Sequence, residues 1–269
     1  MPARNEGKNL PDVLARVPDW VYEVILVDGL SVDDTSAVAR LHMPSIRVVH
    51  QTGRGKGNAL IEGFAQCAGD IIIAIDADGS MDPAEMGAFV EALEAGHDYV
   101  KGSRMVADGG STDLTRFRGF GNWIFRTVAN VLVRSRYTDL CYGYFGFVRG
   151  TVDGLDLRST GFEIEAEITV KAHKAGLRIT EVGSWEAPRS HGVSNLNAFR
   201  DGWRILTTIL KSSFSSTRRS AGGMDQATES VSATDQRDGA PSAQINDLSG
   251  AVLVASEVRD QRDSQMSLD

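Results

Sequence analysis

Two carboxylates follow an apolar run near the middle of the first half of the chain. Residues 71–75 are mostly β-branched, and Asp76 and Asp78 come directly after them with one residue between. A short run that is apolar throughout is typical of a strand buried on both faces of a parallel sheet. Asp82 and Pro83 then predict the N-cap and first residue of a helix. We therefore expect both acids on a loop at the carboxyl end of a central strand, where open α/β sheets bind ligands.

Chemistry at such a loop would centre on a cation. Two neighbouring carboxylates repel each other and lose hydration, and a divalent cation removes that penalty. Hard oxygen ligands suit Mg²⁺ or Mn²⁺, which usually complete their shell with water and substrate phosphates. Asp76 and Asp78 are therefore a candidate metal site, and a loop of solvated acids is the alternative interpretation.

The composition is that of an ordinary globular protein. The 269 residues are 42% hydrophobic and 24% charged. A net charge of −8 and a pI of about 5.2 argue against nucleic acid as a main partner. Cys67 and Cys141 form neither a CxxC motif nor a secreted-type framework, so we expect a reducing cytoplasm. Because no apolar run is long enough to span a bilayer, a membrane role would be peripheral, at the inner face of the plasma membrane.

Strands and helices alternate along the first hundred residues. Strands are predicted at 21–27, 46–50, 70–76 and 98–104, with helices between them. This alternation predicts right-handed βαβ crossovers and an α/β fold with a mostly parallel sheet flanked by helices. A loop is then expected at 106–115, strands at 144–148 and 177–182, and helices at 119–133, 161–175 and 197–211.

Each of the two long helices predicted in the second half carries a set of apolar residues. In residues 119–133 these are Phe120, Trp123, Ile124, Val128, Val131 and Leu132, and in residues 197–211 they are Phe199, Trp203, Ile205, Leu206, Ile209 and Leu210. Residues 1–214 are expected to form one domain. Residues 215–269 are rich in Ser, Asp, Gln, Ala and Gly, and we expect a disordered tail there.

The beginning of the chain is unusual for a nucleotide-binding α/β domain. A strand should lead into the loop that residues 2–6 resemble, and nothing precedes them. A missing central strand would leave neighbouring strands with unpaired backbone groups. We therefore expect that the first strand lies upstream of residue 1.

Five short motifs occur in order over about a hundred residues, each at a predicted strand end or helix start. They are residues 2–6 (PARNE), 27–35 (VDGLSVDDT), 55–59 (GKGNA), 76–79 (DADG) and 101–104 (KGSR). Together they resemble the signatures of family 2 glycosyltransferases with the GT-A fold. The resemblance continues through residues 139–144 and 189–194, where it is similar to the dolichyl/polyprenyl-phosphate sugar transferase branch, and it does not include the tail.

The resemblance implies a site for a nucleoside-diphosphate sugar. Asp76 and Asp78 match the DxD motif that holds the metal on the donor diphosphate, where the metal offsets charge on the leaving group. Glu6 and Asp28 match positions that contact the nucleoside. The other implied donor contacts are Pro2, Ala3, Arg4, Lys56 and Ala77. The glycines around Lys56 let the backbone pass close to a ligand, but the spacing is not that of a P-loop ATPase.

The acceptor side is less clearly marked. Asp139 matches an acidic residue that could act as general base or orient a phosphate acceptor, and an N-cap or turn is the alternative. Glu163 and Glu165 are similar to the acidic helix start that faces the acceptor, although acids are also favoured at any helix N-terminus. The expected catalytic residues are Asp78 and Asp139. The expected acceptor and phosphate contacts are Arg104, Arg118, Glu165, Arg189 and His191.

A basic cluster stands out in this acidic chain. It consists of Arg116, Arg118, Arg126, Arg134 and Arg136. With Phe120 and Trp123 nearby, one hypothesis is contact with anionic lipid headgroups or a lipid phosphate. The alternative is a solvated helix face with core aromatics, and we expect Trp123 in the core. We expect His42, His50, His97 and His173 to be structural or surface residues.

The resemblance thus implies a metal-dependent, inverting glycosyltransferase. It would move a hexose from a UDP- or GDP-linked sugar to a polyprenyl phosphate or a glycan precursor by a single in-line displacement. Two alternatives stay open. One is a nucleotidyltransferase, whose usual glycine-rich loop is missing from residues 2–6, and the other is a non-catalytic nucleotide-sugar sensor. A homodimer is also left open.

Overall fold

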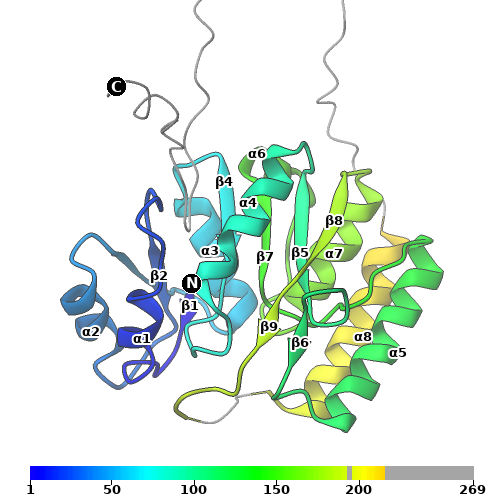
Figure 1. The fold of residues 1–269 in the computed structure, drawn as a ribbon. Helices are drawn as coiled ribbons and strands as arrows, with labels where there is room; N and C mark the ends of the chain where they lie inside the picture. The colour runs from blue at the N-terminus through cyan, green and yellow to red at the C-terminus, as the bar shows by residue number, and fades with distance from the viewer. Residues whose placement is uncertain (193–195, 216–269) are drawn as a thin grey trace, which may run out of the picture.

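The computed structural model describes residues 1–192 and 196–215. Apart from Ser215, the predicted tail lies outside these residues, so its disorder stays a prediction. The amino-terminal part contains a parallel sheet in the order β1-β2-β3, formed by Pro2–Ala3, Ile25–Asp28 and Arg47–His50. The helices α1 (Leu10–Leu14), α2 (Thr35–His42) and α3 (Lys56–Gln66) follow these strands in turn (Figure 1). All four residues of β2 are buried, as expected of a central strand.

A second sheet has the order β4-β7-β5-β8, with strands at Ile71–Ala74, Phe145–Val148, Tyr99–Ser103 and Ile179–Gly183. β5 and β8 are parallel, whereas β7 lies antiparallel between β4 and β5. The predicted α/β architecture is confirmed, and β7 is the exception to its parallel pairing. β7 follows the segment where the alternation of strands and helices stops, so no simple crossover sets its direction.

The remaining elements are short or lie around the second sheet. Asp82 caps the predicted helix start, because its Oδ1 accepts a hydrogen bond from the Ala84 amide, and η1 (Pro83–Glu85) leads into α4 (Met86–Glu94). The expected loop at 106–115 contains β6 (Gly110–Ser111), which pairs with β9 (Trp185–Glu186). The others are α6 (Arg149–Val152), η2 (Asp153–Leu155) and α7 (Ile164–Lys174).

The first residues of the chain pair with β2. The carbonyl of Met1 accepts a hydrogen bond from the Val27 amide, and β1 itself has two residues. A short strand thus leads into the loop that begins at Arg4, and the expectation of a strand upstream of residue 1 stays a prediction.

Two long helices, α5 (Arg116–Val133) and α8 (Ala198–Phe214), lie side by side at one end of the molecule, beyond α7 (Figure 1). A small core between α5, α7 and α8 includes Ala129, Val170, Ile205 and Ile209. None of the helices in the described part of the chain is long and apolar enough to cross a bilayer.

The expectation that Trp123 lies in the core is wrong. Trp123 is 50% exposed and Trp203 is 68% exposed. Phe120, Val131, Phe199 and Leu210 are exposed as well. The reason is that each helix packs through a narrow stripe, which leaves its other apolar residues facing away from the protein.

Candidate active site

A cavity of about 470 Å³ opens where the predicted donor motifs meet. Eight residues predicted to bind the nucleotide sugar line it, namely Pro2, Ala3, Arg4, Glu6, Lys56, Asp76, Ala77 and Asp78. Motifs up to 76 residues apart in the sequence converge here because they follow strands that end at the same edge of the fold. Gly29 and Leu30 also line the cavity.

Asp28 is the one predicted donor residue that is not part of this lining. Its Oδ1 accepts a hydrogen bond from the Ser31 amide at 2.8 Å, and its Oδ2 accepts one from Ser36 Oγ at 2.6 Å. Burial alone would raise the pKa of Asp28, but these hydrogen bonds outweigh it and lower the pKa. The structure therefore places Asp28 as the residue that orders the loop at 29–31, of which Gly29 and Leu30 line the cavity.

The first acid of the pair is held by a lysine. Lys56 Nζ donates to Asp76 Oδ2 at 2.8 Å and to Glu165 Oε1 at 2.7 Å. Burial raises the pKa of Asp76 to about 6, although the charge of Lys56 acts in the opposite direction. Burial would lower the pKa of Lys56, but the two carboxylates outweigh this and raise it. The predicted acceptor residue Glu165 is thus joined directly to the donor side of the site.

A glycine makes this position of Lys56 possible. Gly55 precedes α3 with φ of +92°, a conformation that L-residues rarely adopt. A Cβ at Gly55 would collide with the carbonyl oxygen of Thr160. The loop can therefore pass close to the segment before α7 only because residue 55 has no side chain.

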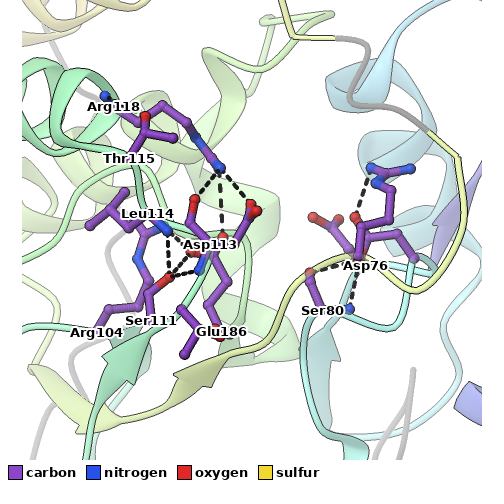
Figure 2. Close-up of polar contacts among 12 residues, drawn as sticks. Asp76, Ser80, Arg104, Ser111, Asp113, Leu114, Thr115, Arg118 and Glu186 are labelled. Carbon is purple, nitrogen blue, oxygen red and sulfur yellow. Dashed lines mark hydrogen bonds and ion pairs between the residues drawn. The ribbon is translucent and has the colours of Figure 1, made fainter.

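The second acid is held by an arginine. Asp78 Oδ1 accepts hydrogen bonds from the amide and the hydroxyl of Ser80, at 3.0 and 2.7 Å. Arg189 Nη2 lies 2.7 Å from Asp78 Oδ2, and Arg189 Nη1 donates to Glu6 Oε1 at 2.9 Å. Figure 2 shows the contacts beside Asp76 and Ser80. Burial raises the pKa of Glu6, so the nearby guanidinium stabilises a carboxylate that is otherwise costly to ionise.

His191 lies behind this part of the site rather than in the cavity lining. Its Nδ1 is 3.1 Å from Asn9 Oδ1, and Asn9 Nδ2 donates to Glu6 Oε2 at 2.5 Å. His191 thus reaches the site only through Asn9, a residue that the sequence analysis did not single out. The placement does not support direct phosphate binding by His191.

The carboxylate pair fits a hard divalent cation. Asp76 and Asp78 lie on one loop, and each forms an ion pair through one carboxylate oxygen, Asp76 with Lys56 and Asp78 with Arg189. Across residues 1–192 and 196–215, no group of three or more His, Cys, Asp or Glu side chains could form a complete metal site. A cation here would therefore take the rest of its shell from water and from phosphate oxygens, which is the usual behaviour of Mg²⁺.

A separate charged network surrounds Glu186 (Figure 2), and Arg104 connects it to Asp139. Arg104 donates to Asp139 through Nε at 2.7 Å and through Nη2 at 3.0 Å, and to Glu186 through Nη1 at 2.9 Å. Arg118 Nη2 lies 3.6 Å from Glu186 Oε1, and Arg118 Nη1 donates to Asp113 at 2.7 Å. Arg104 and Arg118, both predicted phosphate contacts, are therefore engaged in this network and outside the cavity lining.

Asp139 is a predicted catalytic residue, either as general base or by orienting a phosphate acceptor, and its contacts do not favour the base role. Its side chain is fully buried, and both of its oxygens accept hydrogen bonds from Arg104. Burial would raise the pKa of Asp139, but Arg104 outweighs it and lowers the pKa below the ordinary value. A carboxylate that is buried, ion-paired and weakly basic is better suited to a structural role than to proton abstraction.

The far wall of the cavity comes from residues that the sequence analysis missed. Arg200, Asp201 and Arg204 of α8 line it, together with Gly161 and Phe162. Arg204 Nη2 donates to Glu163 Oε1 at 2.7 Å, which ties α8 to the start of α7. Arg200 and Arg204 are four residues apart, which places them on one face of the predicted helix. This spacing is the sequence signal that could have identified them.

Comparisons with known proteins agree with the predicted resemblance. A model of the family described as glycosyl transferase family 2 matches residues 1–154. The undecaprenyl-phosphate mannosyltransferase of Micrococcus luteus is 31% identical over 209 residues, which are 73% of this chain and 86% of that protein. The polyprenol monophosphomannose synthase of Mycolicibacterium smegmatis is 30% identical over 210 residues, which are 73% of this chain and 79% of that protein.

A solved structure shows the same fold. The glucosyl-3-phosphoglycerate synthase of Mycobacterium tuberculosis, crystallised with Mn²⁺, UDP and phosphoglyceric acid, matches with a TM-score of 0.64 and 22% identity. The match includes 79% of this chain and 76% of that one. The GT-A fold expected from the sequence is confirmed by this likeness.

Proposed function

The chain belongs to glycosyl transferase family 2 and is a glycosyltransferase, and we propose that it transfers a hexose from a nucleoside-diphosphate sugar to a polyprenyl phosphate. We further propose that Mg²⁺ or Mn²⁺ bound by Asp76 and Asp78 assists the reaction. The protein would act as a peripheral protein at the inner face of the plasma membrane.

The observation that carries this proposal is the arrangement of charges in the cavity. Asp76 and Asp78 lie between Lys56 on one side and Arg189 on the other, within a lining formed by the predicted donor motifs. Carboxylates for a metal and cations for phosphates are the two groups that a metal–diphosphate complex needs. The M. tuberculosis synthase, crystallised with both Mn²⁺ and UDP, supports the same kind of donor.

The chain's own residues have distinct roles in this proposal. Asp76 and Asp78 would hold the cation, and Glu6 and Arg4 would contact the nucleoside. Arg189 would turn from Asp78 toward a phosphate of the donor. When bound, the cation would stabilise the negative charge that develops on the leaving nucleoside diphosphate.

The acceptor is proposed from chemistry and from relatives. A phosphate acceptor is already anionic and needs little deprotonation, which agrees with a site where Asp76, Asp78 and Glu165 are all engaged by cationic side chains. The names of the M. luteus and M. smegmatis relatives mention undecaprenyl phosphate and polyprenol. Inversion at the sugar by a single displacement is part of the same proposal.

A donor and acceptor screen tests this function. The protein is incubated with UDP-glucose, GDP-mannose or a nucleoside triphosphate, with or without Mn²⁺, and with a short-chain polyprenyl phosphate. We expect one donor to yield free nucleoside diphosphate and a glycolipid only when Mn²⁺ and the acceptor are present. Donor binding without turnover would support a sensor, and release of pyrophosphate from a nucleoside triphosphate would support a nucleotidyltransferase, so either result would overturn the proposal.

A further inference from the structure

The outward faces of α5 and α8 carry large apolar side chains. On α8, Phe199 is 83% exposed and Phe214 is 77% exposed, with Trp203 and Leu210 exposed between them. The intervals of four, seven and four residues place all of them on one face of the helix. On α5, Phe117, Phe120, Trp123 and Val131 are exposed in the same way. A surface helix normally presents polar residues on its outward face, so these two apolar stripes indicate a surface that binds a partner.

The two stripes form one continuous surface. The ring centroids of Phe117 on α5 and Phe199 on α8 are 6.1 Å apart. Phe120 stacks on Trp123 with 5.8 Å between centroids. The two helices lie side by side at the end of the molecule (Figure 1). We call the exposed residues Phe117, Phe120, Trp123, Phe199, Trp203 and Phe214 the aromatic surface.

The charges that α5 and α8 themselves present to solvent have a single sign, although Asp113, just before α5, pairs with Arg118. Within α5 the charged residues are Arg116, Arg118 and Arg126. Within α8 they are Arg200, Arg204, Lys211 and Asp201, and Asp201 is only 2% exposed. Every charge that reaches solvent from these two helices is therefore positive, although the whole chain has a net charge of −8. Exposed aromatics among arginines are typical of helices that lie on anionic lipid.

A second copy of this chain fits the surface less well. In a symmetric dimer the same patch faces itself, so the arginines of one copy would lie near those of the other. Like charges brought together at an interface are unfavourable. Phosphate headgroups would instead complement the cations, while the aromatic rings enter the layer below them.

We propose that the aromatic surface docks on an anionic lipid bilayer and thereby holds the mouth of the active-site cavity at the lipid surface. On α8, Phe199 and Trp203 face outward, and the residues that directly follow them, Arg200 and Arg204, line the cavity. One helix thus joins the lipid-facing surface to the catalytic site. A lipid phosphate entering from the bilayer would meet these two arginines, and this last step rests on the proposed function.

Vesicle sedimentation of the full chain tests the docking. Vesicles of phosphatidylglycerol and phosphatidylcholine are compared with phosphatidylcholine alone, at low and high salt. Phe199→Ser with Trp203→Ser removes two exposed rings, and Arg126→Glu with Lys211→Glu reverses two charges. The matched control is Tyr22→Ser with Leu41→Ser, which removes apolar side chains that are 65% and 74% exposed on a different part of the molecule.

We expect the wild type to bind the anionic vesicles and to release them as salt rises. Each test pair should lower the lipid partition coefficient by about tenfold or more, and the control pair should leave it unchanged. Circular dichroism melting of every variant distinguishes lost binding from lost folding. Equal binding by the Phe199→Ser/Trp203→Ser variant and the wild type would overturn the proposal, as would wild-type binding with no preference for anionic lipid.

Two further measurements separate the alternatives. Sedimentation equilibrium without lipid would overturn the docking if the wild type is a dimer that the Phe199→Ser/Trp203→Ser variant breaks into monomers. Transfer to a short-chain, water-soluble polyprenyl phosphate is measured in the absence of vesicles, and we expect the wild type and the aromatic variant to perform it equally. Vesicle binding without any such transfer would count against the proposed function and not against the docking.

Discussion

Arg189 Nη2 lies 2.7 Å from Oδ2 of Asp78, the second acid of the proposed metal pair. The arginine comes from the segment after β9, and it also donates to Glu6 Oε1. A divalent cation bound at Asp78 and this guanidinium would compete for the same carboxylate. The binding of metal and the release of Arg189 toward a donor phosphate are therefore expected to be linked.

Replacing this arginine should affect metal and nucleotide in opposite directions. We expect Arg189→Met to increase the affinity for Mn²⁺ alone by about fivefold, because a competing positive charge is removed. The affinity for a nucleoside diphosphate in the presence of Mn²⁺ should fall, because a phosphate contact is lost. Electron paramagnetic resonance of free Mn²⁺ and calorimetry measure the two affinities. Weaker binding of Mn²⁺ alone would contradict the competition.

Lys56 should be essential for the stability of the site. Lys56→Met leaves Asp76 and Glu165 close together and unpaired, and we expect a loss of about 3 kcal/mol in the free energy of unfolding. Adding Glu165→Gln should recover part of that loss, because one of the two repelling charges is removed. Urea denaturation measures both effects. The control Lys8→Met, at an exposed lysine, should change little, and equal stability of all variants would refute the argument.

Substitution of Asp139 distinguishes a structural role of this residue from a catalytic one. Asp139→Asn should lower the free energy of unfolding by about 3 kcal/mol, because it leaves the buried guanidinium of Arg104 less compensated. The folded fraction should still transfer sugar within about threefold of the wild-type rate, whereas loss of a general base costs about a hundredfold or more. A stable Asp139→Asn protein with a hundredfold lower rate would instead support the base role.

The lowered pKa of Asp139 predicts that the stability of the protein depends on pH. The pKa of Asp139 is lowered in the folded protein, so its contribution is fully present above the ordinary carboxyl pKa. The contribution is lost as the pH falls through the lowered pKa. Acid unfolding followed by circular dichroism should therefore show a smaller loss of stability below about pH 4 in Asp139→Asn than in the wild type.

Gly55 should tolerate no side chain. Gly55→Ala places a Cβ at a φ of +92° and against the Thr160 carbonyl, so we expect donor affinity to fall by about tenfold or more. The matched control is Gly87→Ala in α4, where an added Cβ meets nothing within 4 Å and φ is not positive. That change should leave donor binding intact and raise stability by up to about 1 kcal/mol. Equal donor affinities for both variants would contradict the role given to Gly55.

The donor side of the site could be predicted because its determinants are local. The acids of residues 76–79 and the glycines around Lys56 mark where a strand ends and a helix begins, and the fold then brings them together. The acceptor side depends on pairings between distant segments. Arg104 donates to Glu186 of β9, a two-residue strand that pairs with β6, and no periodicity in the sequence marks so short a strand.

The long helices show a second limit of the sequence. α5 and α8 have apolar residues on more than one face, and a helical period alone cannot say which face is buried. Packing on α7 selects Ile205 and Ile209 for the core and leaves Phe199 and Trp203 outside. The inward turn of Arg200 and Arg204 follows from the same packing.

The central claim is that Asp76 and Asp78 bind a cation that in turn binds the phosphates of a sugar nucleotide. Its most direct test is anomalous scattering from crystals soaked with Mn²⁺ and a nucleoside diphosphate, for the wild type and for Asp78→Ala. We predict a manganese peak in the wild type between these two carboxylates and the diphosphate, and its loss in a folded, inactive Asp78→Ala protein. A manganese peak elsewhere, or an Asp78→Ala enzyme that still transfers sugar, would contradict the claim.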